Sequence, residues 1–495
     1  MKPETALVSV YDKSGIVDFC SALDEAGVVI VSTGGTAGVL DDAGIPVVPI
    51  EDITGFANLM DGRVKTLHTD IYAGLLARRG SEDMDLLIRE DITPIDMVVC
   101  NFYDPELGID EMDIGGPCMV RAAAKNWRDV VVVSHPSQYQ RVAAALPDVD
   151  EELRRTLAYA AVRRTAFYDA SIAGQQDSQA FPELFAPPYR LDTTLRYGEN
   201  PHQRGAFYRG AIGEPCVASA VKLQGKEISY NNILDASDAI ECVKEFDEPT
   251  VVIMKHATPS GVASSKNLAK AWDEAYATDE YSPFGGVVAV NRDVDRELAG
   301  KMTQIFLEVV IAPGYTEAAR EILEQKENLR LLEVEGLDCP ERQPSFELRS
   351  VGGGLLVQDR DIKPFNPGEW EAVTEAEPTP DDIETMVFAA KCVKHVKSNA
   401  IVFAKGTHTV AIGGGQTSRV DASWIATKKG GKNVKGSVMA SDAFFPFRDA
   451  VDVAAKAGIR AIVQPGGSIR DSEVIEAANE HDIPMVFTGR RYFLH

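Results

Sequence analysis

Residues 251–263 read VVIMKHATPSGVA. The β-branched apolar run predicts a buried strand that delivers Lys255 and His256 to its end, and the following Thr-Pro-Ser-Gly predicts a loop. A histidine in this position can accept a proton near neutral pH, and a neighbouring lysine can stabilise a developing oxyanion. The stretch therefore indicates group transfer to a weak nucleophile. In isolation the same pair is also typical of a solvated lysine beside a structural histidine, so the rest of the chain must decide.

The first part of the chain alternates short β-branched runs with helical patterns. Apolar runs at 5–10, 28–32 and 46–50 are separated by helical patterns that begin near residues 14 and 36. This alternation predicts an α/β domain whose parallel strands are joined by crossover helices.

Two loops of this region have the composition of a phosphate-binding site. Residues 11–15 (YDKSG) and 32–36 (STGGT) each follow a predicted strand and precede a predicted helix, where glycines let backbone amides approach a phosphate. The candidate phosphate ligands are Ser9, Lys13, Thr33, Gly34, Gly35 and Thr36. The alternative interpretation is an ordinary glycine turn between strand and helix.

A second group of polar residues is expected at the same edge of the sheet. The segment RVKTLH (63–68) is too polar for a core, and the segments FY (102–103), DIGG (113–116) and RAAAKN (121–126) add further polar side chains. Open α/β folds bind ligands at the carboxyl ends of their strands, so these segments predict a mixed-charge pocket above the phosphate loops. Its candidate residues are Arg63, Lys65, Thr66, Tyr103, Asp113 and Lys125.

Composition narrows the classes of function. A chain of 495 residues predicts two to four domains, and its net charge of −25 argues against nucleic acid or an anionic membrane as partner. The seven cysteines form no metal-binding or disulfide pattern, and there is no leader-like or membrane-length apolar segment. We therefore expect a cytoplasmic protein without a catalytic metal.

Proline-bearing segments divide the rest of the chain. Residues 181–190 (FPELFAPPYR) predict a linker, which places a boundary between residues 188 and 189. The acidic segment 367–380 predicts a softer boundary, which gives subdomains of about 189–367 and 381–495. Within the last part, the run FFPF at 444–447 is either core or a platform for a flat ring.

Taken in order, these motifs resemble one known family. The segments STGGTA, GRVKTLH, DIGG, RAAAKN, LRYGENPHQ, MKHATPSG, PFGG, VIAPGY, SNAIVFAKG, GGGQTSR and SDAFFPFRD span nearly the whole chain. They resemble the bifunctional enzymes of purine biosynthesis that join AICAR transformylase to IMP cyclohydrolase. The resemblance implies a methylglyoxal-synthase-like cyclohydrolase domain (1–188) and a transformylase domain (189–495) of two cytidine-deaminase-like subdomains.

The resemblance also implies ligands and roles. Formyl transfer from 10-formyltetrahydrofolate to AICAR gives formyl-AICAR, and dehydrative ring closure then gives IMP, with the transformylase site shared across a homodimer. His256 would be the base, Lys255 would stabilise the oxyanion, and Asn399 would position the formyl group. The remaining residues expected to bind substrate are Arg196, Tyr197, Asn232, Gly285, Glu308, Arg419, Phe444 and Arg491. In the cyclohydrolase, Lys65 and Lys125 would supply charge and protons, and Tyr103 and Asp113 would orient the amide.

Two departures lie beside the expected cyclohydrolase residues. Thr69 stands where the family usually has proline, and Asp104-Pro105 stands where it commonly has Pro-Phe; the segment between Tyr103 and Asp113 also looks shortened. Two alternatives follow: a monofunctional transformylase with an N-terminal nucleotide-binding regulatory module, and a non-enzymatic nucleotide sensor. The intact Lys255-His256 pair argues against the sensor.

Overall fold

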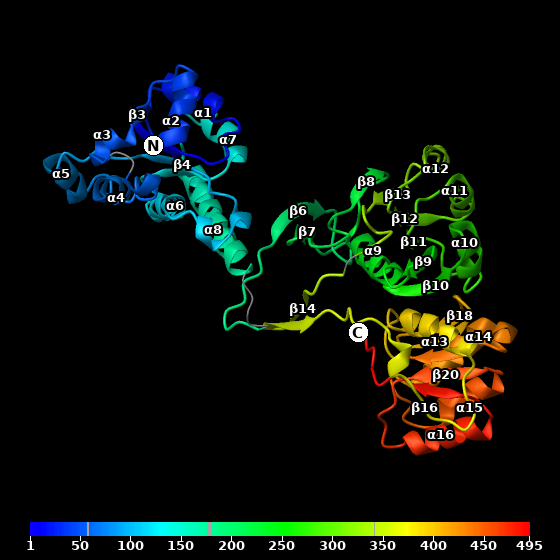
Figure 1. The fold of residues 1–495 in the computed structure, drawn as a ribbon. Coiled ribbons are helices and arrows are strands. Elements are labelled where there is room, and N and C mark those ends of the chain that lie inside the picture. The colour runs from blue at the N-terminus through cyan, green and yellow to red at the C-terminus, as the bar shows by residue number, and fades with distance from the viewer. Residues whose placement is uncertain (57–58, 176–180, 341) are drawn as a thin grey trace. The chain divides into compact units, whose positions relative to one another are not determined.

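The computed structural model describes residues 1–56, 59–175, 181–340 and 342–495. The chain divides into two compact units, an N-terminal unit (Met1–Arg190) and a C-terminal unit (Leu191–His495), which are described separately. Figure 1 shows the elements of each unit. Among the described residues, no helix is both long and apolar enough to cross a membrane.

The N-terminal unit is an α/β domain built on a parallel sheet. Its strands lie in the order β3-β2-β1-β4-β5, and each neighbouring pair is parallel, which confirms the predicted fold class. Its elements are β1 (Thr5–Ser9), α1 (Ile16–Glu25), β2 (Val29–Ser32), α2 (Gly34–Asp42), β3 (Val48–Pro49), α3 (Ile50–Thr54), α4 (Thr69–Leu76), α5 (Glu82–Arg89), β4 (Met97–Cys100), α6 (Gly115–Lys125), β5 (Val131–Val133), α7 (Tyr139–Ala143) and α8 (Glu151–Ala173).

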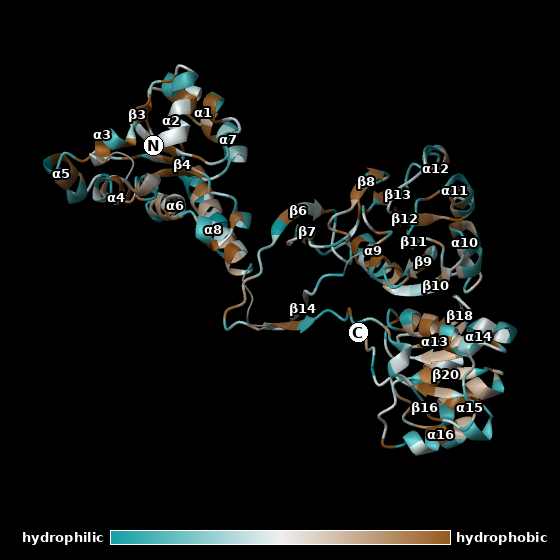
Figure 2. Cartoon of the chain, in the orientation of Figure 1, coloured by the Kyte–Doolittle hydropathy of each residue, from teal (hydrophilic) through white to brown (hydrophobic). Residues whose placement is uncertain are grey.

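The core of the N-terminal unit is formed around its central strands. β1, β4 and β5 are apolar along almost their whole length because helices cover both faces of the sheet, as is typical of parallel sheets. Figure 2 shows β4 in hydrophobic colours. The longest helix, α8, is capped by Asp150, whose carboxylate accepts the Leu153 N–H at 2.7 Å, and the helix packs against α6 and β5.

The C-terminal unit is organised around one large mixed sheet. The strand order is β16-β21-β20-β19-β17-β18-β10-β9-β11-β12-β13-β8. Its elements are β6 (Arg190–Leu195), β7 (Gly205–Arg209), β8 (Val221–Gln224), α9 (Tyr230–Val243), β9 (Thr250–Lys255), β10 (Thr258–Ser264), α10 (Leu268–Tyr276), β11 (Gly286–Val290), α11 (Arg296–Met302), β12 (Leu307–Ala312), α12 (Glu317–Leu323), β13 (Arg330–Glu333), β14 (Phe346–Val351), β15 (Gly354–Asp359), β16 (Glu371–Ala372), α13 (Pro380–Val393), β17 (Ile401–Lys405), β18 (His408–Gly413), α14 (Arg419–Gly430), β19 (Val438–Ser441), α15 (Asp449–Lys456), β20 (Ala461–Gln464), α16 (Asp471–Glu480) and β21 (Met485–Phe487).

This sheet contains the same topology twice. In the first half, β9 pairs antiparallel with β10 and β11, and β12 and β13 then add in parallel; in the second half, β17 pairs with β18 and β19, and β20 and β21 follow. The repeat agrees with the two similar subdomains that the family resemblance implies. Its signal is weak but present, because Cys-Val-Lys occurs at 242–244 and again at 392–394, and Lys255 and Lys405 end equivalent strands.

The two halves share one core. Helices α9 and α13, which occupy equivalent places in the repeat, contribute to the same buried cluster, in which the rings of Phe246 and Phe388 lie 5.4 Å apart. At the centre of the sheet β10 meets β18 antiparallel, with Ala263 opposite His408. The halves therefore form a continuous sheet rather than two separate domains.

The predicted loop after His256 is wrong. Residues 258–264 form β10, which returns antiparallel to β9 after a two-residue turn at His256 and Ala257. Proline near the start of a segment predicts a loop because it has no N–H to donate to a partner strand. Here the strand register shifts between Pro259 and Gly261, and a β-bulge tolerates a residue without an N–H. Gly261 is needed because an added Cβ would lie 2.0 Å from the Ala275 carbonyl oxygen of α10.

Candidate active sites

The two phosphate-loop segments of the N-terminal unit meet at the carboxyl ends of β1 and β2. Ser9 Oγ lies 2.8 Å from Thr33 Oγ1, and Thr36 Oγ1 donates to the Val10 carbonyl oxygen at 3.1 Å. Thr33 is the N-cap of α2 but makes no capping bond from its side chain, so the first amides of the helix, those of Gly34 and Gly35, remain available. This arrangement suits an anion at a helix N-terminus.

Asn101, which the sequence analysis did not single out, shapes the neighbouring loop. Its Oδ1 accepts the backbone N–H groups of Tyr11 and Asp12 at 2.7 and 2.9 Å, and its Nδ2 donates to the Asp12 carbonyl oxygen. Lys13 is held nearby, since its Nζ donates to the Val10 carbonyl oxygen at 3.2 Å. A polar residue directly after a buried strand was the available signal.

Lys65, Thr66 and Asp113 lie together beside these loops. A Cβ added at Gly34 would be 3.4 Å from Lys65 Nζ, and one added at Gly115 would be 2.6 Å from Thr66 Oγ1. Asp113 Oδ1 accepts the Gly116 N–H at 2.9 Å, at the start of α6. Lys65 is therefore next to the N-terminus of α2, and the Asp113 carboxylate is at the N-terminus of α6.

The electrostatics of this pocket are set by burial. Burial raises the pKa of Asp113, and the nearby Lys65 ammonium opposes that rise. Burial and the Asp113 carboxylate raise the pKa of Tyr103, whose ring lies 5.3 Å from that of Tyr11. A lysine, a carboxyl group and a neutral phenol thus face one small region, which suits proton transfer during ring closure.

Lys125 is not brought to this pocket within one chain. It is the last residue of α6, whose eleven residues span about 15 Å, whereas Asp113 precedes the first turn of that helix. Lys125 is exposed and lies toward the amino end of β5. Arg63 is also exposed, and its Nε donates to the Met60 carbonyl oxygen at 3.2 Å.

Both departures from the family pattern fit their local structure. Thr69 is the first residue of α4, a position at which proline is also favourable. The preceding residue, His68, caps the helix, because its Nδ1 accepts the Asp70 N–H. Asp104 caps a short 3-10 turn (Pro105–Leu107) by accepting the Glu106 N–H at 3.0 Å. Each residue thus starts or caps a local helical turn.

In the C-terminal unit, His256 stands at the tip of the β9–β10 hairpin. His256 and Ala257 have φ angles of 51° and 55°, as a two-residue hairpin turn requires, although side chains disfavour that region. Asp235 of α9 accepts the Ala257 N–H at 2.7 Å and stabilises the turn. The imidazole is exposed at this tip, where a substrate can reach it.

Lys255 is aimed by the segment before β11. Its Nζ donates to the carbonyl oxygens of Phe284 and Gly285 at 2.8 and 3.0 Å. Gly285 has a φ of 69°, and its N–H donates to the Phe306 carbonyl oxygen at 2.7 Å. The rings of Phe284 and Phe306 lie 5.3 Å apart and are largely exposed, so an aromatic surface that the sequence analysis missed flanks the lysine.

Asn399 belongs to a buried network in the second half. Its Oδ1 accepts from Arg419 Nη2 at 2.7 Å, and its Nδ2 donates to the Gln416 carbonyl oxygen at 2.9 Å. The other arm of Arg419 forms an ion pair with Asp442, which also accepts Ser398 Oγ–H at 2.5 Å. Arg419 is therefore committed to orienting the Asn399 amide and is buried.

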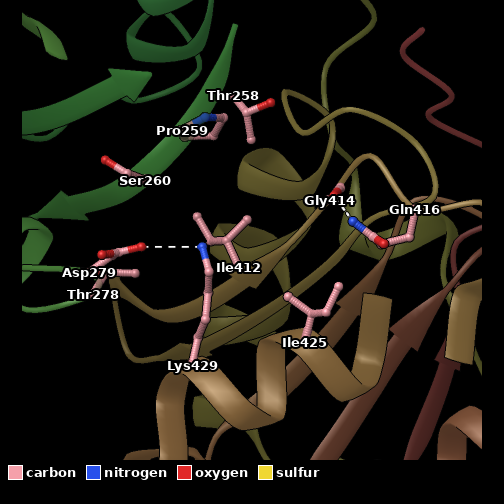
Figure 3. A pocket seen from close by; sticks show the side chains of 10 residues that line it. All are labelled: Thr258, Pro259, Ser260, Thr278, Asp279, Ile412, Gly414, Gln416, Ile425 and Lys429. Carbon is pink, nitrogen blue, oxygen red and sulfur yellow. Dashed lines mark hydrogen bonds and ion pairs between the residues drawn. The ribbon is translucent and has the colours of Figure 1, made fainter. Parts of the chain in front are cut away.

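A cavity of about 270 Å³ lies between the first and second halves of the C-terminal unit, near the segments that carry His256 and Asn399. Figure 3 shows its walls, with the Asp279–Lys429 ion pair, 3.2 Å long, on one side and Gln416 on the other. Thr258, two residues after His256, lines it, as does Gln416, which accepts from Asn399. Neighbours of His256 and Asn399, but neither residue itself, therefore line this cavity within one chain.

The other expected ligands lie on several elements of the C-terminal unit. The Arg196 guanidinium lies 5.7 Å from the Tyr197 ring, and Asn232 closes a capping box with Ser229 at the start of α9. Glu308 forms an ion pair with the buried Arg330. Arg491 lies over the Phe493 ring, and Phe444 is part-exposed beside the fully buried Phe445, so the FFPF run is both core and surface.

The described residues contain no group of three or more His, Cys, Asp and Glu side chains that could hold a metal ion. The seven cysteines, all within the described ranges, are free thiols.

Comparison with known proteins identifies related families for both units. Family models match residues 15–117 as an MGS-like domain and residues 123–429 as an AICARFT/IMPCHase bienzyme. A bifunctional purine biosynthesis protein PurH from Acetivibrio thermocellus is 48% identical, and one from Persephonella marina is 49% identical; each match covers 99% of both chains. A solved structure described as the crystal structure of ForH is 36% identical over 34% of this chain and 97% of its own, with a TM-score of 0.33.

The chain therefore belongs to the AICARFT/IMPCHase bienzyme family, the bifunctional enzymes of purine biosynthesis. It catalyses formyl transfer to AICAR, with a folate-type co-substrate, and the ring closure that yields IMP. The predicted function is thereby confirmed, and a monofunctional transformylase with a regulatory module is not favoured.

Proposed function

We propose that the formyl donor is 10-formyltetrahydrofolate and that residues 189–495 carry out the transfer, with His256 as the base. The AICAR amine is conjugated to its ring and carboxamide, so it must lose a proton as it attacks the formyl carbon. The exposed imidazole at the hairpin tip is the observation that supports this role. Lys255, held against the carbonyls of Phe284 and Gly285, stabilises the tetrahedral oxyanion and protonates the folate nitrogen as it leaves.

Asn399 positions the formyl group in this proposal. Its amide is oriented by Arg419 and Gln416, which leaves one N–H of its Nδ2 to donate to a formyl oxygen. Arg196, Tyr197 and Arg491 hold the nucleotide and its phosphate, and Phe444 lines the pocket.

Ring closure belongs, in this proposal, to residues 1–188. The open amides of α2 bind the phosphate together with Ser9, Thr33 and Thr36. Asp113 takes the proton of the carboxamide nitrogen as it attacks the formyl carbon, and Lys65 and Tyr103 stabilise the oxygen that leaves as water. The adjacency of Lys65, Asp113 and the α2 N-terminus supports these roles. Lys125 supplies charge only from a second copy or from a rearranged chain, since α6 separates it from Asp113.

We further propose a cytoplasmic homodimer whose transformylase site is shared between two copies. The free thiols support a reducing compartment, and the exposed apolar side chains of β15, Leu355 and Leu356, support an interface. Mixing the His256→Ala and Asn399→Ala chains tests the shared site. A mixed dimer would regain one intact site if the two residues come from different copies, and no activity returns if they act within one chain.

The overall proposal is tested by identifying the product formed from AICAR and 10-formyltetrahydrofolate. We expect IMP. The Lys65→Ala variant is expected to stop at formyl-AICAR, and unchanged IMP formation by that variant would remove Lys65 from the mechanism.

A further inference from the structure

Tyr168 of α8 contacts both segments that carry the proposed cyclohydrolase residues. The backbone N–H of Asp113 donates to Tyr168 Oη at 2.8 Å. The Tyr168 ring packs against Phe102, the neighbour of Tyr103, at 5.2 Å between centroids and an interplanar angle of 60°. The Tyr168 side chain therefore contacts both Phe102, which precedes Tyr103, and the backbone of Asp113.

These segments have little regular structure of their own. Between β4 and α6 the chain contains two short 3-10 turns, Pro105–Leu107 and Ile109–Glu111. The Asp113 carboxylate accepts hydrogen bonds from the backbone of Tyr103 and Gly116, but little regular structure joins the two catalytic residues along the chain. α8 provides further support, because Gln175, just beyond its end, donates to the Pro105 carbonyl oxygen and Tyr168 accepts the Asp113 N–H.

Tyr168 itself is firmly placed. It is 3% exposed and sits in the long helix α8, which packs against α6 and β5. Burial raises the pKa of Tyr168, with the Asp113 carboxylate adding to the rise, so the phenol stays neutral and acts as the acceptor for the Asp113 N–H. A packed helix thus fixes a point of the segment that ends at Asp113.

We infer that Tyr168 is a positioning residue of the cyclohydrolase, which sets the Asp113 carboxyl group relative to Tyr103 and Lys65. The inference rests on the role proposed above for Asp113. Tyr168 does not touch the substrate in this assignment, and it acts only through the segment that ends at Asp113.

The test is the Tyr168→Phe variant, which keeps the ring contact with Phe102 and removes only the hydroxyl. We expect the kcat for cyclisation of supplied formyl-AICAR to fall about tenfold or more, because misplacing a catalytic group by a fraction of an ångström is costly. KM should stay within about twofold, since the phosphate loops are untouched, and transformylase activity should not change. The matched control is Tyr159→Phe, an exposed tyrosine of the same helix.

A double-mutant cycle with Asp113→Asn separates this inference from the proposed function. If Tyr168 acts through Asp113, the Tyr168→Phe change should cost little further activity once Asp113→Asn is present. Additive losses would overturn the inference, as would a Tyr168→Phe enzyme with cyclisation within twofold of wild type, or one with raised KM and unchanged kcat. Full activity in the Asp113→Asn variant alone would instead refute the role of Asp113.

Discussion

Replacing Gly116 by alanine should lower the rate of cyclisation sharply and leave the stability of the fold almost unchanged. Gly116 is the second residue of α6, and a Cβ there would lie 2.4 Å from Asp113 Oδ2, 3.1 Å from Asp113 Cγ and 3.2 Å from Cys100 Sγ. The carboxylate must withdraw by about 1 Å to reach an ordinary contact distance, and the bond from the Gly116 N–H to Oδ1 is then strained or lost.

The expected cost is large for the reaction and small for the fold. A displacement of about 1 Å in a catalytic group lowers the rate by roughly a hundredfold. Alanine in place of glycine in a helix contributes up to about 1 kcal/mol of stability, which offsets the local crowding. Cyclisation should therefore collapse while the protein stays folded.

The assay supplies formyl-AICAR and measures IMP formation by chromatography, with formyl transfer to AICAR measured in the same preparation. The matched control is Gly38→Ala on the exposed side of α2, where an added Cβ meets no atom within 4 Å. Both activities of this control should equal those of the wild type. A Gly116→Ala enzyme that cyclises within about threefold of wild type would refute the importance assigned to the Asp113 position.

Three further predictions concern the other groups described above. His256→Ala should abolish formyl transfer and spare cyclisation of supplied formyl-AICAR; equal loss of both activities would show that the sites are not separable. Asp442→Ala should lower the free energy of unfolding by roughly 3–5 kcal/mol, because the buried Arg419 guanidinium loses its counter-charge, and urea denaturation that shows a loss below about 1 kcal/mol would contradict this. Because burial raises the pKa of Asp113, the kcat of cyclisation should fall on acidification with a midpoint above the ordinary value of about 4, and Asp113→Asn should remove that limb. The same shift means that protonated Asp113 favours the folded state, so its contribution to stability is full at low pH and is lost as pH rises through the raised pKa.

Much of the fold could be predicted because its signals are local. The alternation of apolar runs and helical patterns predicts the parallel sheet of the N-terminal unit, and Ser229 with Asn232 marks the start of α9 through a capping box. The repeat of the C-terminal unit was predicted only through the family resemblance, because equivalent positions in its two halves have diverged. β10 escaped because the proline that suggests a loop is accommodated by a bulge, which depends on the partner strand.

For the candidate sites, too, only the features encoded by neighbouring residues could be predicted. The residue types at Lys255, His256 and Asp113 were recognisable from their motifs, since each motif is contiguous. The geometry of the sites could not be predicted in this way, because it depends on partners that are far away in the chain. Arg419, for example, is held by Asp442.

The sequence by itself determined the class of fold, the family and the residue types that do the chemistry, because propensities and motifs are encoded by neighbouring residues. Only the tertiary structure decided that Arg419 orients Asn399, that Tyr168 supports Asp113, and that α6 separates Lys125 from that carboxyl group within one chain. The physical reason is that hydrogen bonds and packing join residues that are distant along the chain, so their identity follows from how helices and strands pack and not from local sequence.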